Sequence, residues 1–472
     1  YGRYFMWNFA GRQNDIQGHG NILDGNWISG IKAIDEQRLG NQDRLPSSMT
    51  QNKAFNSFFL LPLLLGVIGL VFQLFRNVRD WTVVMLLFFF TGVAIVIYLN
   101  QTPYQPRERD YAYVGSFYAF AIWIGLGVYA LFDAARNLAQ KELATVVGGA
   151  VGLGALKFVL EWDGDHAISY SILYMAVLGG GALALFFLLG KVLKNDAVHG
   201  VLATLLGLAI PAVMVAEGWD DHDRSTRVPA RDLASDYLES CAPNAILFTN
   251  GDNDTFPLWY AQEVEGIRTD VRVVNLSLLN TDWYIDQMRR QAYESKPVPF
   301  ALAPEKYRQG TRDVVALIPQ GKGYRDLKEM MAFVANDRNM QVLFQRGVKD
   351  AYFPTDMFSI AADSATVFGT GTLQQGDTSW VPRVNWKIDR QVLLKNHLMV
   401  LDLLANNNWE RPIYFAVTTG PDSYINLQDY FQLEGLTYRV VPVFSPNKNP
   451  NLQGRVATDI MFDNVMDKFK WG

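Results

Sequence analysis

The sequence predicts a bundle of about six transmembrane helices followed by a soluble α/β domain with a mainly parallel sheet. Three observations lead to this fold class. Hydrophobic residues make up 49% of the 472 residues and charged residues only 19%, an apolar share above that of ordinary soluble enzymes. Almost every long apolar run precedes Ala216. The remainder alternates short strand-like and helix-like patterns at the polarity of a globular protein.

We expect three segments along the chain: an extracytoplasmic segment rich in aromatic and amide residues (1–54), a transmembrane region (55–216) and an extracytoplasmic, periplasmic α/β domain (217–472). A membrane-crossing helix needs roughly 20 mainly apolar residues. Six stretches qualify, near residues 55–75, 81–99, 112–132, 143–160, 168–190 and 201–216. The fourth stretch is the weakest, because it is short, rich in glycine and interrupted by Lys157. Its glycines would equally permit close helix packing.

The loops between the helices predict their orientation, because short cytoplasmic loops carry an excess of Lys and Arg. Alternate loops contain basic pairs, which are Arg76 with Arg79, Arg136 with Lys141, and Lys191 with Lys194. The opposite set includes the acidic loop 161–165, which has no Lys or Arg. The basic loops are therefore expected in the cytoplasm, and both the first segment and the domain after Ala216 on the outer face.

One outer loop carries two arginines against this charge pattern. Arg107 and Arg109 lie between two prolines and the third predicted helix. One interpretation is that they bind an anionic head group, such as the phosphate of a lipid-linked sugar, with their guanidinium groups. The alternative is that they pair with Glu108 and Asp110 and cap the helix.

The first segment combines flat aromatic rings with amides, as in Trp7 with Asn8 and Arg12 with Gln13. Sugar rings stack on Trp, and amides hydrogen-bond hydroxyl groups. Trp7 and Arg12 are therefore candidate substrate-binding residues. The alternative is an interfacial loop that its aromatic residues anchor in the membrane surface.

The second half begins with strand, helix, strand, helix, over residues 245–249, 256–264, 271–277 and 282–291. This order is typical of a βαβ unit, and ligands of such sheets bind beyond the carboxyl ends of the strands. Asp252, Asn253 and Asp254 follow the first of these strands and are candidate substrate-binding residues, with residues 280–282 expected beside them. The alternative is that they only begin the next helix.

Several classes of function are not indicated. The net charge of -5 argues against a nucleic-acid-binding surface. His222 stands among three aspartates in residues 217–224, but a single His without a second His or Cys does not predict a metal site. We therefore expect no metal and no bound cofactor, although a divalent cation would be compatible with the acidic loops.

Four segments together resemble a family of large bacterial envelope proteins that are protein O-mannosyltransferase-like and belong to the GT-C type of multi-pass membrane glycosyltransferases. They are residues 105–113 (QPRERDYAY), 219–224 (WDDHDR), 250–262 (NGDNDTFPLWYAQ) and 411–414 (RPIY). The chain is similar to the C-terminal portion of such proteins, and its abrupt ends fit a piece of a longer polypeptide.

The resemblance implies sugar transfer from a polyprenyl-phosphate-linked donor to envelope proteins, at the outer face of the bacterial inner membrane. It implies Arg107 and Arg109 as the donor-phosphate-binding pair. The catalytic base of such enzymes lies in an earlier loop, so none is assigned here. Expected partners are the lipid bilayer, the lipid-linked sugar and the acceptor protein. The competing hypothesis is a non-enzymatic envelope scaffold or accessory subunit that docks a complex partner through its α/β domain.

Overall fold

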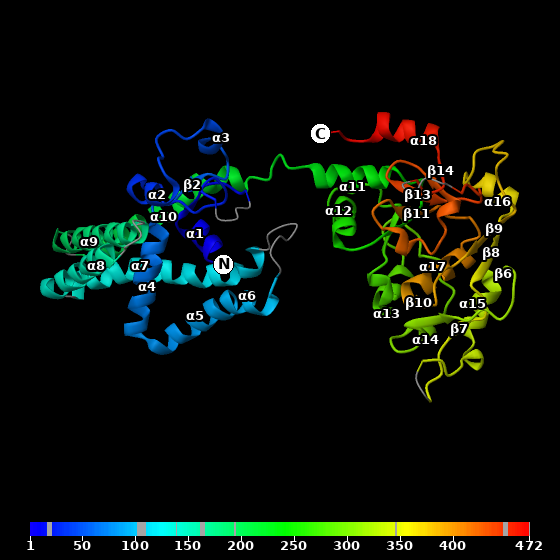
Figure 1. Ribbon diagram of the computed structural model, residues 1–472, viewed down its shortest axis with the longest axis horizontal. Helices are drawn as coiled ribbons and strands as arrows, with labels where there is room; N and C mark the ends of the chain where they lie inside the picture. Colours follow the sequence, from blue (N-terminus) through cyan, green and yellow to red (C-terminus); the bar gives the residue numbers. More distant parts are fainter. Residues whose placement is uncertain are drawn as a thin grey trace. The chain divides into compact units, whose positions relative to one another are not determined.

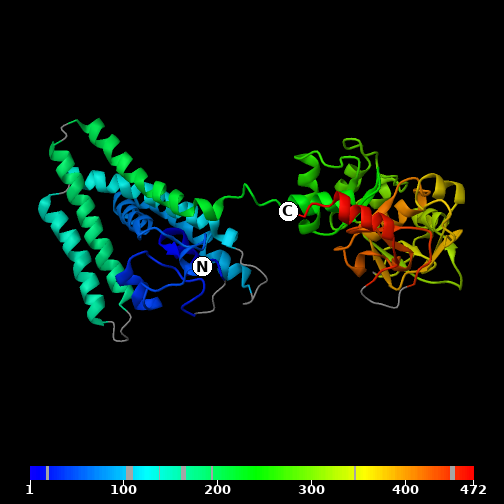
Figure 2. The ribbon, with the colours of Figure 1, turned by 90° about the horizontal axis from the view of Figure 1, so that it is seen from above.

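The computed structural model describes residues 1–16, 21–101, 110–137, 139–160, 166–192, 195–344, 347–446 and 452–471. The chain forms two compact units, Tyr1–Arg224 and Ser225–Gly472. Figures 1 and 2 draw the first unit from blue to green and the second from green to red. Each unit has hydrophobic clusters of its own, so each is described by itself.

The first unit is almost entirely helical. Its elements are α1 (Gly2–Phe9), β1 (Gly11–Arg12), α2 (Lys32–Leu39), α3 (Ser47–Thr50), β2 (Asn56–Ser57), α4 (Leu61–Arg76), α5 (Val78–Phe90), α6 (Val93–Leu99), η1 (Asp110–Tyr113), α7 (Val114–Asn137), α8 (Gln140–Leu160), α9 (Ala167–Val192) and α10 (Asp196–His222).

Four helical segments in the described part of the chain are long and apolar enough to cross a membrane. They are Val78–Leu99, Tyr111–Asn137, Ala167–Val192 and Asp196–His222. Two further apolar helices, Leu61–Arg76 and Ala144–Leu160, are shorter. At 1.5 Å per residue, a helix as short as α4 spans about 24 Å of a hydrocarbon layer of about 30 Å. Each of the six predicted stretches contains a helix, although the first, 55–75, is helical only from Leu61 because β2 occupies its start. The count of six membrane-crossing helices is not confirmed.

The helices α4 and α7 approach each other so closely that two glycines are required. A Cβ atom added to Gly69 would overlap the carbonyl oxygen of Trp123, and one added to Gly127 would overlap that of Leu65. Beside this contact, Trp123 donates its indole N–H to Oε1 of Gln73 at 2.7 Å. Small residues permit such close contacts between apolar helices, and a side-chain hydrogen bond adds to them.

The glycines of α8, by contrast, do not mediate a comparable contact. A Cβ atom added to Gly148, Gly149 or Gly152 would meet nothing within 4 Å among the described residues. Only Gly154 faces a neighbouring helix, where an added Cβ atom would lie 2.8 Å from the side chain of Leu173 in α9. Composition alone does not tell which glycines face a partner.

The second unit alternates short strands and helices. Its elements are α11 (Pro229–Glu239), β3 (Ile246–Thr249), α12 (Asp252–Glu263), β4 (Arg272–Asn275), η2 (Leu278–Asn280), α13 (Asp282–Met288), α14 (Pro304–Tyr307), β5 (Val314–Leu317), β6 (Arg325–Asp326), α15 (Leu327–Ala335), η3 (Asp337–Asn339), β7 (Tyr352–Phe353), β8 (Met357–Ala361), α16 (Ser364–Gly369), β9 (Arg383–Lys387), β10 (Val392–Leu394), α17 (Lys395–Asn406), β11 (Ile413–Ala416), η4 (Pro421–Ser423), η5 (Gln428–Tyr430), β12 (Phe431–Leu433), β13 (Thr437–Val440), β14 (Arg455–Val456), α18 (Thr458–Asp463) and η6 (Asn464–Lys468).

The main sheet is mixed, so the prediction of a mainly parallel sheet was wrong. Its strand order is β14-β12-β13-β11-β3-β4. The strands β11, β3 and β4 run parallel, but β13 is antiparallel to both β11 and β12. The two three-stranded sheets, β10-β5-β7 and β6-β8-β9, each contain one parallel and one antiparallel pair. The βαβ pattern correctly predicted the parallel pair β3–β4. It did not predict the short turn at Gly435, which connects β12 to β13 and makes these two strands antiparallel.

The central strand β3 is buried on both faces. Ile246 and Phe248 belong to a large core that also contains most of α17, whereas Leu247 belongs to a second core with residues of α11 and α12. Successive side chains of a strand point to opposite faces, so this alternation shows that helices cover both sides of the sheet. The carboxyl ends of the parallel strands β11, β3 and β4 therefore lie together at one edge.

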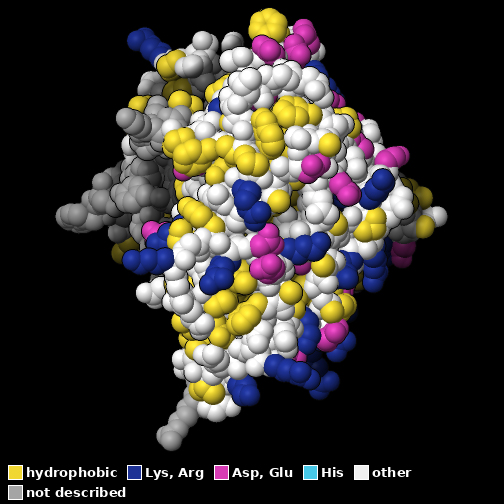
Figure 3. All heavy atoms as spheres, turned by 90° about the vertical axis from the view of Figure 1, so that its right-hand side faces the viewer, with side chains coloured by type: hydrophobic (Ala, Val, Ile, Leu, Met, Phe, Trp, Pro, Cys, Tyr) yellow, Lys and Arg dark blue, Asp and Glu magenta, His cyan; other side chains and the backbone are white. Residues whose placement is uncertain are grey.

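On the face in Figure 3, basic and acidic side chains are interspersed among hydrophobic ones rather than gathered into one charged area. Such mixed charge is typical of a solvent-exposed domain surface.

Replacing Gly69 by Leu should separate α4 from α7, because the added side chain overlaps the backbone of Trp123 and overpacking costs about 1–3 kcal/mol or more. We expect a several-fold loss of monodisperse protein after extraction in detergent, measured by size-exclusion chromatography. The matched control is Gly149→Leu, where an added Cβ atom meets nothing within 4 Å in the described part of the chain. Equal yields of the two variants would contradict the packing described here.

Candidate functional site

A polar cluster forms at the C-terminal end of α10, where the first segment of the chain contacts this helix. Strands β1 and β2 pair in antiparallel fashion, with Arg12 opposite Asn56 and Gly11 opposite Ser57. Arg12 forms an ion pair with Asp221 through Nη2. One turn earlier on the same helix, Glu217 accepts a hydrogen bond from the backbone N–H of Ser57 at 3.2 Å.

The ion pair between Arg12 and Asp221 is largely shielded from solvent, since the two side chains are only 18% and 17% exposed. Arg12 also donates Nε–H to the carbonyl oxygen of Ala54 at 3.1 Å. Its guanidinium lies 5.6 Å from the centre of the Trp7 ring, within the range of a cation–π interaction. The structure thus brings together two of the residues predicted from the sequence, Trp7 and Arg12, and adds Asp221.

The indole N–H of Trp7 is buried and has no hydrogen-bond partner within the described ranges. Buried indole N–H groups usually have a partner. Trp7 therefore places its ring next to a cation and keeps a buried N–H donor without a partner among the described residues.

The amides of the first segment have a different role from the one their composition indicated. Asn14 accepts hydrogen bonds from the backbone of Gly25 at 2.8 Å and of Ile16 at 3.2 Å. Gln13 accepts from the side chain of Asn26 at 2.9 Å. Gln13 and Asn14 are both buried. They hold their own loop together rather than facing a sugar.

The proposed phosphate-binding residues Arg107 and Arg109 lie outside the described residues. The described chain resumes with η1, which leads directly into α7. The ring of Tyr113 in η1 lies 5.8 Å from that of Tyr1 at the start of the chain. Tyr113 thus lies next to the first segment.

The predicted residues Asp252, Asn253 and Asp254 form the first turn of α12, beyond the carboxyl end of β3. Asp252 and Asn253 are exposed and Asp254 is half-buried. None of the three caps the helix through its side chain, because the N-cap position is Gly251. Their carboxylate and amide groups lie at the helix N-terminus, where negative charge is favourable.

The carboxyl end of the neighbouring strand β4 lies beside this turn. Ser277 donates its hydroxyl to Asn250 at 2.7 Å, and Asn275 donates to the carbonyl oxygen of Gly251 at 3.0 Å. Asp282 accepts from the backbone N–H groups of Trp283 and Gln309, and these hydrogen bonds lower the pKa of its carboxyl. Asp282 is therefore a structural acceptor.

The described residues of the two units do not form the geometry of a metal site. No group of three His, Cys, Asp or Glu side chains within the described part of the chain converges on one point. His222 is exposed and its Nδ1 lies 2.7 Å from the carbonyl oxygen of Gly218.

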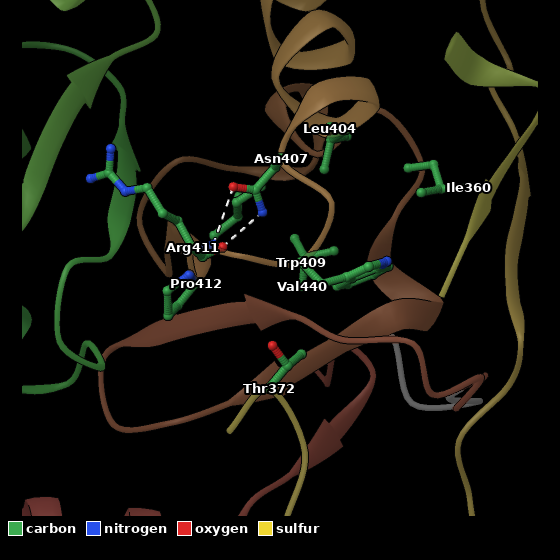
Figure 4. A pocket seen from close by; sticks show the side chains of 9 residues that line it. Ile360, Thr372, Leu404, Asn407, Trp409, Arg411, Pro412 and Val440 are labelled. Carbon is green, nitrogen blue, oxygen red and sulfur yellow. Dashed lines mark hydrogen bonds between the residues drawn. The ribbon is translucent and has the colours of Figure 1, made fainter. Parts of the chain in front are cut away.

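Buried ionisable groups of the second unit also have structural roles. The carboxylate of Asp402 accepts hydrogen bonds from the backbone of Ala301 and Leu302 at 2.8 and 3.0 Å, and burial raises its pKa to about 6. Figure 4 shows the side chain of Asn407 forming hydrogen bonds with the backbone of Arg411, next to a cavity of about 20 Å³. The side chain of Arg411 points away from the other labelled residues. A cavity of this size holds about one water molecule.

Sequence reasoning missed the partnership of Asp221 with Arg12. The available signal was the spacing of Glu217 and Asp221, which places both carboxylates on one face of a helix. It was overlooked because we expected the last helix to end near Ala216, whereas α10 continues to His222.

Residues 230–460, which lie within the second unit, match the family model of TMEM260-associated domain 2. No curated protein and no solved structure matches the chain.

Replacing Arg12 by Ala should lower the thermal stability of the chain in detergent. Because the pair is neither fully buried nor exposed, we expect a coupling energy of about 1–3 kcal/mol with Asp221 in a double-mutant cycle. The exposed pair Lys32 and Asp43, whose side chains are 53% and 58% exposed, serves as the control and should give less than about 1 kcal/mol. A coupling no larger than that of the control would show that the cluster is not a structural unit.

Proposed function

We propose that this chain belongs to a membrane glycosyltransferase-like protein that transfers a sugar from a polyprenyl-phosphate-linked donor to envelope proteins. In this proposal the reaction takes place at the outer face of the bacterial inner membrane, and the second unit lies in the periplasm. The single observation that carries the proposal is the Trp7–Arg12–Asp221 cluster at the end of a candidate membrane span.

The position of this cluster suits a lipid-linked substrate. A polyprenyl chain lies among apolar helices, and its head group lies where those helices leave the hydrocarbon. The cluster occupies the end of α10, and the buried indole N–H of Trp7 has no partner in the described part of the chain. Since Asp221 already balances the charge of Arg12, we assign Trp7 to contact with the sugar and Arg12 to positioning Trp7.

Binding of the donor phosphate then requires other cations, and we assign it to Arg107 and Arg109. Their loop leads into η1, which contacts the first segment through Tyr113 and Tyr1. Guanidinium groups bind phosphate oxygens in forked geometry. In our proposal, these two arginines supply the positive charges for the donor phosphate.

The family match supports the second unit as part of the same system. TMEM260, after which the matched domain is named, is a protein with a proposed O-mannosyltransferase activity. In our proposal, Asp252, Asn253 and Asp254 contact the acceptor protein or its sugar, because they are accessible at the strand end without capping the helix.

A non-enzymatic envelope scaffold is the second candidate. The observation in its favour is that the second unit has its own extensive core, as a docking domain would. This alternative predicts a stable partner protein and no change in envelope glycans when the gene is deleted.

The test compares intact masses of envelope proteins from a deletion strain complemented with different full-length variants. The variant with Arg107→Ala and Arg109→Ala should not restore glycosylation, because it lacks the phosphate-binding charges. The matched control replaces Arg76 and Arg79, another arginine pair at a helix end, and should restore it. Membrane immunoblots must show equal amounts of both variants.

Two outcomes distinguish the hypotheses. Restored glycosylation with the Arg107 and Arg109 variant would exclude the phosphate-binding role. Unchanged glycan masses in the deletion strain itself would contradict the transferase and favour the scaffold.

A further inference from the structure

The second unit contains a cavity of about 360 Å³ beside β4, the edge strand of the six-stranded sheet. It lies between α12, β4 and α13, away from the exposed turn of Asp252. The rings of Trp259, Tyr284 and Tyr293 line it together with the amide of Gln287. Polar residues such as Gln262 and Gln291 form the rest of the wall together with apolar ones. A volume of roughly 300–1,000 Å³ is typical of small-molecule sites.

Arg272 on β4 forms part of the wall of this cavity. The residue is only 5% exposed. Its Nη2 donates to the carbonyl oxygens of Gln287 and Arg290 at 2.9 and 3.0 Å, and both of these residues also line the cavity. Its Nε and Nη1 are buried and have no hydrogen-bond partner among the described residues. A guanidinium has five N–H donors on three nitrogens. In Arg272, the donors on Nε and Nη1 form no hydrogen bond within the described structure.

No carboxylate within the described ranges forms an ion pair with Arg272. Glu263 lines the cavity, but its carboxylate accepts a hydrogen bond from the hydroxyl of Tyr293. Burial lowers the pKa of Arg272. The neighbouring Arg268, by contrast, pairs with Asp270 at 2.8 Å. Because buried charges in proteins are normally paired, the charge of Arg272 calls for an anion.

A second buried guanidinium increases the positive potential at this place. Burial, and then the charge of Arg272, lowers the pKa of Arg411 to about 10. Arg411 donates to the carbonyl oxygens of Asn244 and Lys296 at 2.9 and 3.0 Å. Carbonyl dipoles satisfy its N–H groups but leave its charge unbalanced. The exposed Arg290 adds a third cation at the cavity rim.

We infer that this cavity binds a small organic oxyanion, a phosphate or carboxylate carried by a ring of about monosaccharide size. In this proposal the Arg272 side chain turns its unpaired Nε and Nη1, which are buried in the ligand-free chain, toward the cavity and donates to the oxyanion. Arg290 attracts the oxyanion to the rim, and the rings of Trp259 and Tyr293 flank the ligand ring. Phosphate and carboxylate share the chemistry that Arg272 recognises. The inference stands independently of the proposed glycosyl transfer.

The test is isothermal titration calorimetry on the full chain in detergent with four probes. Glucose 1-phosphate and glucuronate represent the phosphate and carboxylate forms, glucose lacks the charge, and inorganic phosphate lacks the ring. We expect at least one of the two charged sugars to bind about tenfold more tightly than glucose and than inorganic phosphate. Whichever charged sugar binds more tightly shows whether the cavity prefers phosphate or carboxylate. No binding of either at about 10 mM, or equal binding of glucose, would overturn the inference.

Variants locate the binding at this cavity. Arg272→Met should weaken binding of the charged sugar by about tenfold or more, with an unchanged circular dichroism spectrum. Should this variant not fold, Tyr293→Ala on the more exposed wall should weaken binding while leaving β4 intact. The matched control is Arg325→Met, which removes an exposed arginine of the same unit outside the cavity. Binding of wild-type strength in both Arg272→Met and Tyr293→Ala would place the ligand elsewhere and contradict the inference.

Discussion

The ion pair between Arg12 and Asp221 is the interaction on which the arrangement of the first unit depends. It joins residues that are 209 positions apart, and with the contact of Ser57 to Glu217 it ties the antiparallel pair β1–β2 to the last turn of α10. Removing one partner would leave a half-buried charge and free the first segment from the helix. The same pair holds Trp7 beside a cation, so the structure and the candidate site share one constraint.

The two units stabilise their buried cations in different ways. In the first unit, a carboxylate on a neighbouring element balances the cation. In the second unit, Arg411 relies on backbone carbonyl groups, and Arg272 keeps two nitrogens without partners in the described structure. Hydrogen bonds to carbonyls satisfy donors but do not neutralise charge. This difference is why the ligand-binding inference concerns Arg272 and not Arg12.

Hydrophobic patterning predicted the helices and the first strands of the second unit, because periodicity and length are local properties of the sequence. It did not predict the mixed sheet, since strand direction depends on how the chain returns, as at Gly435. The contact of Gly69 with α7 and the ion pair of Arg12 with Asp221 join residues that are far apart in the sequence, so local sequence patterns do not predict them. Trp7 and Arg12 were found from residue type, whereas Asp221 required knowing that α10 continues to His222.

The central claim is that the cluster and the second unit face the outer side of the membrane, where a lipid-linked donor would be used. Labelling of cysteine variants with a membrane-impermeant maleimide tests it most directly. Cys241 is buried, and burial raises the pKa of its thiol, so it should stay unreactive. We predict that Asp15→Cys and Lys322→Cys react in intact spheroplasts and that Arg79→Cys reacts only after lysis. Reaction of Arg79→Cys alone in intact spheroplasts would contradict the account.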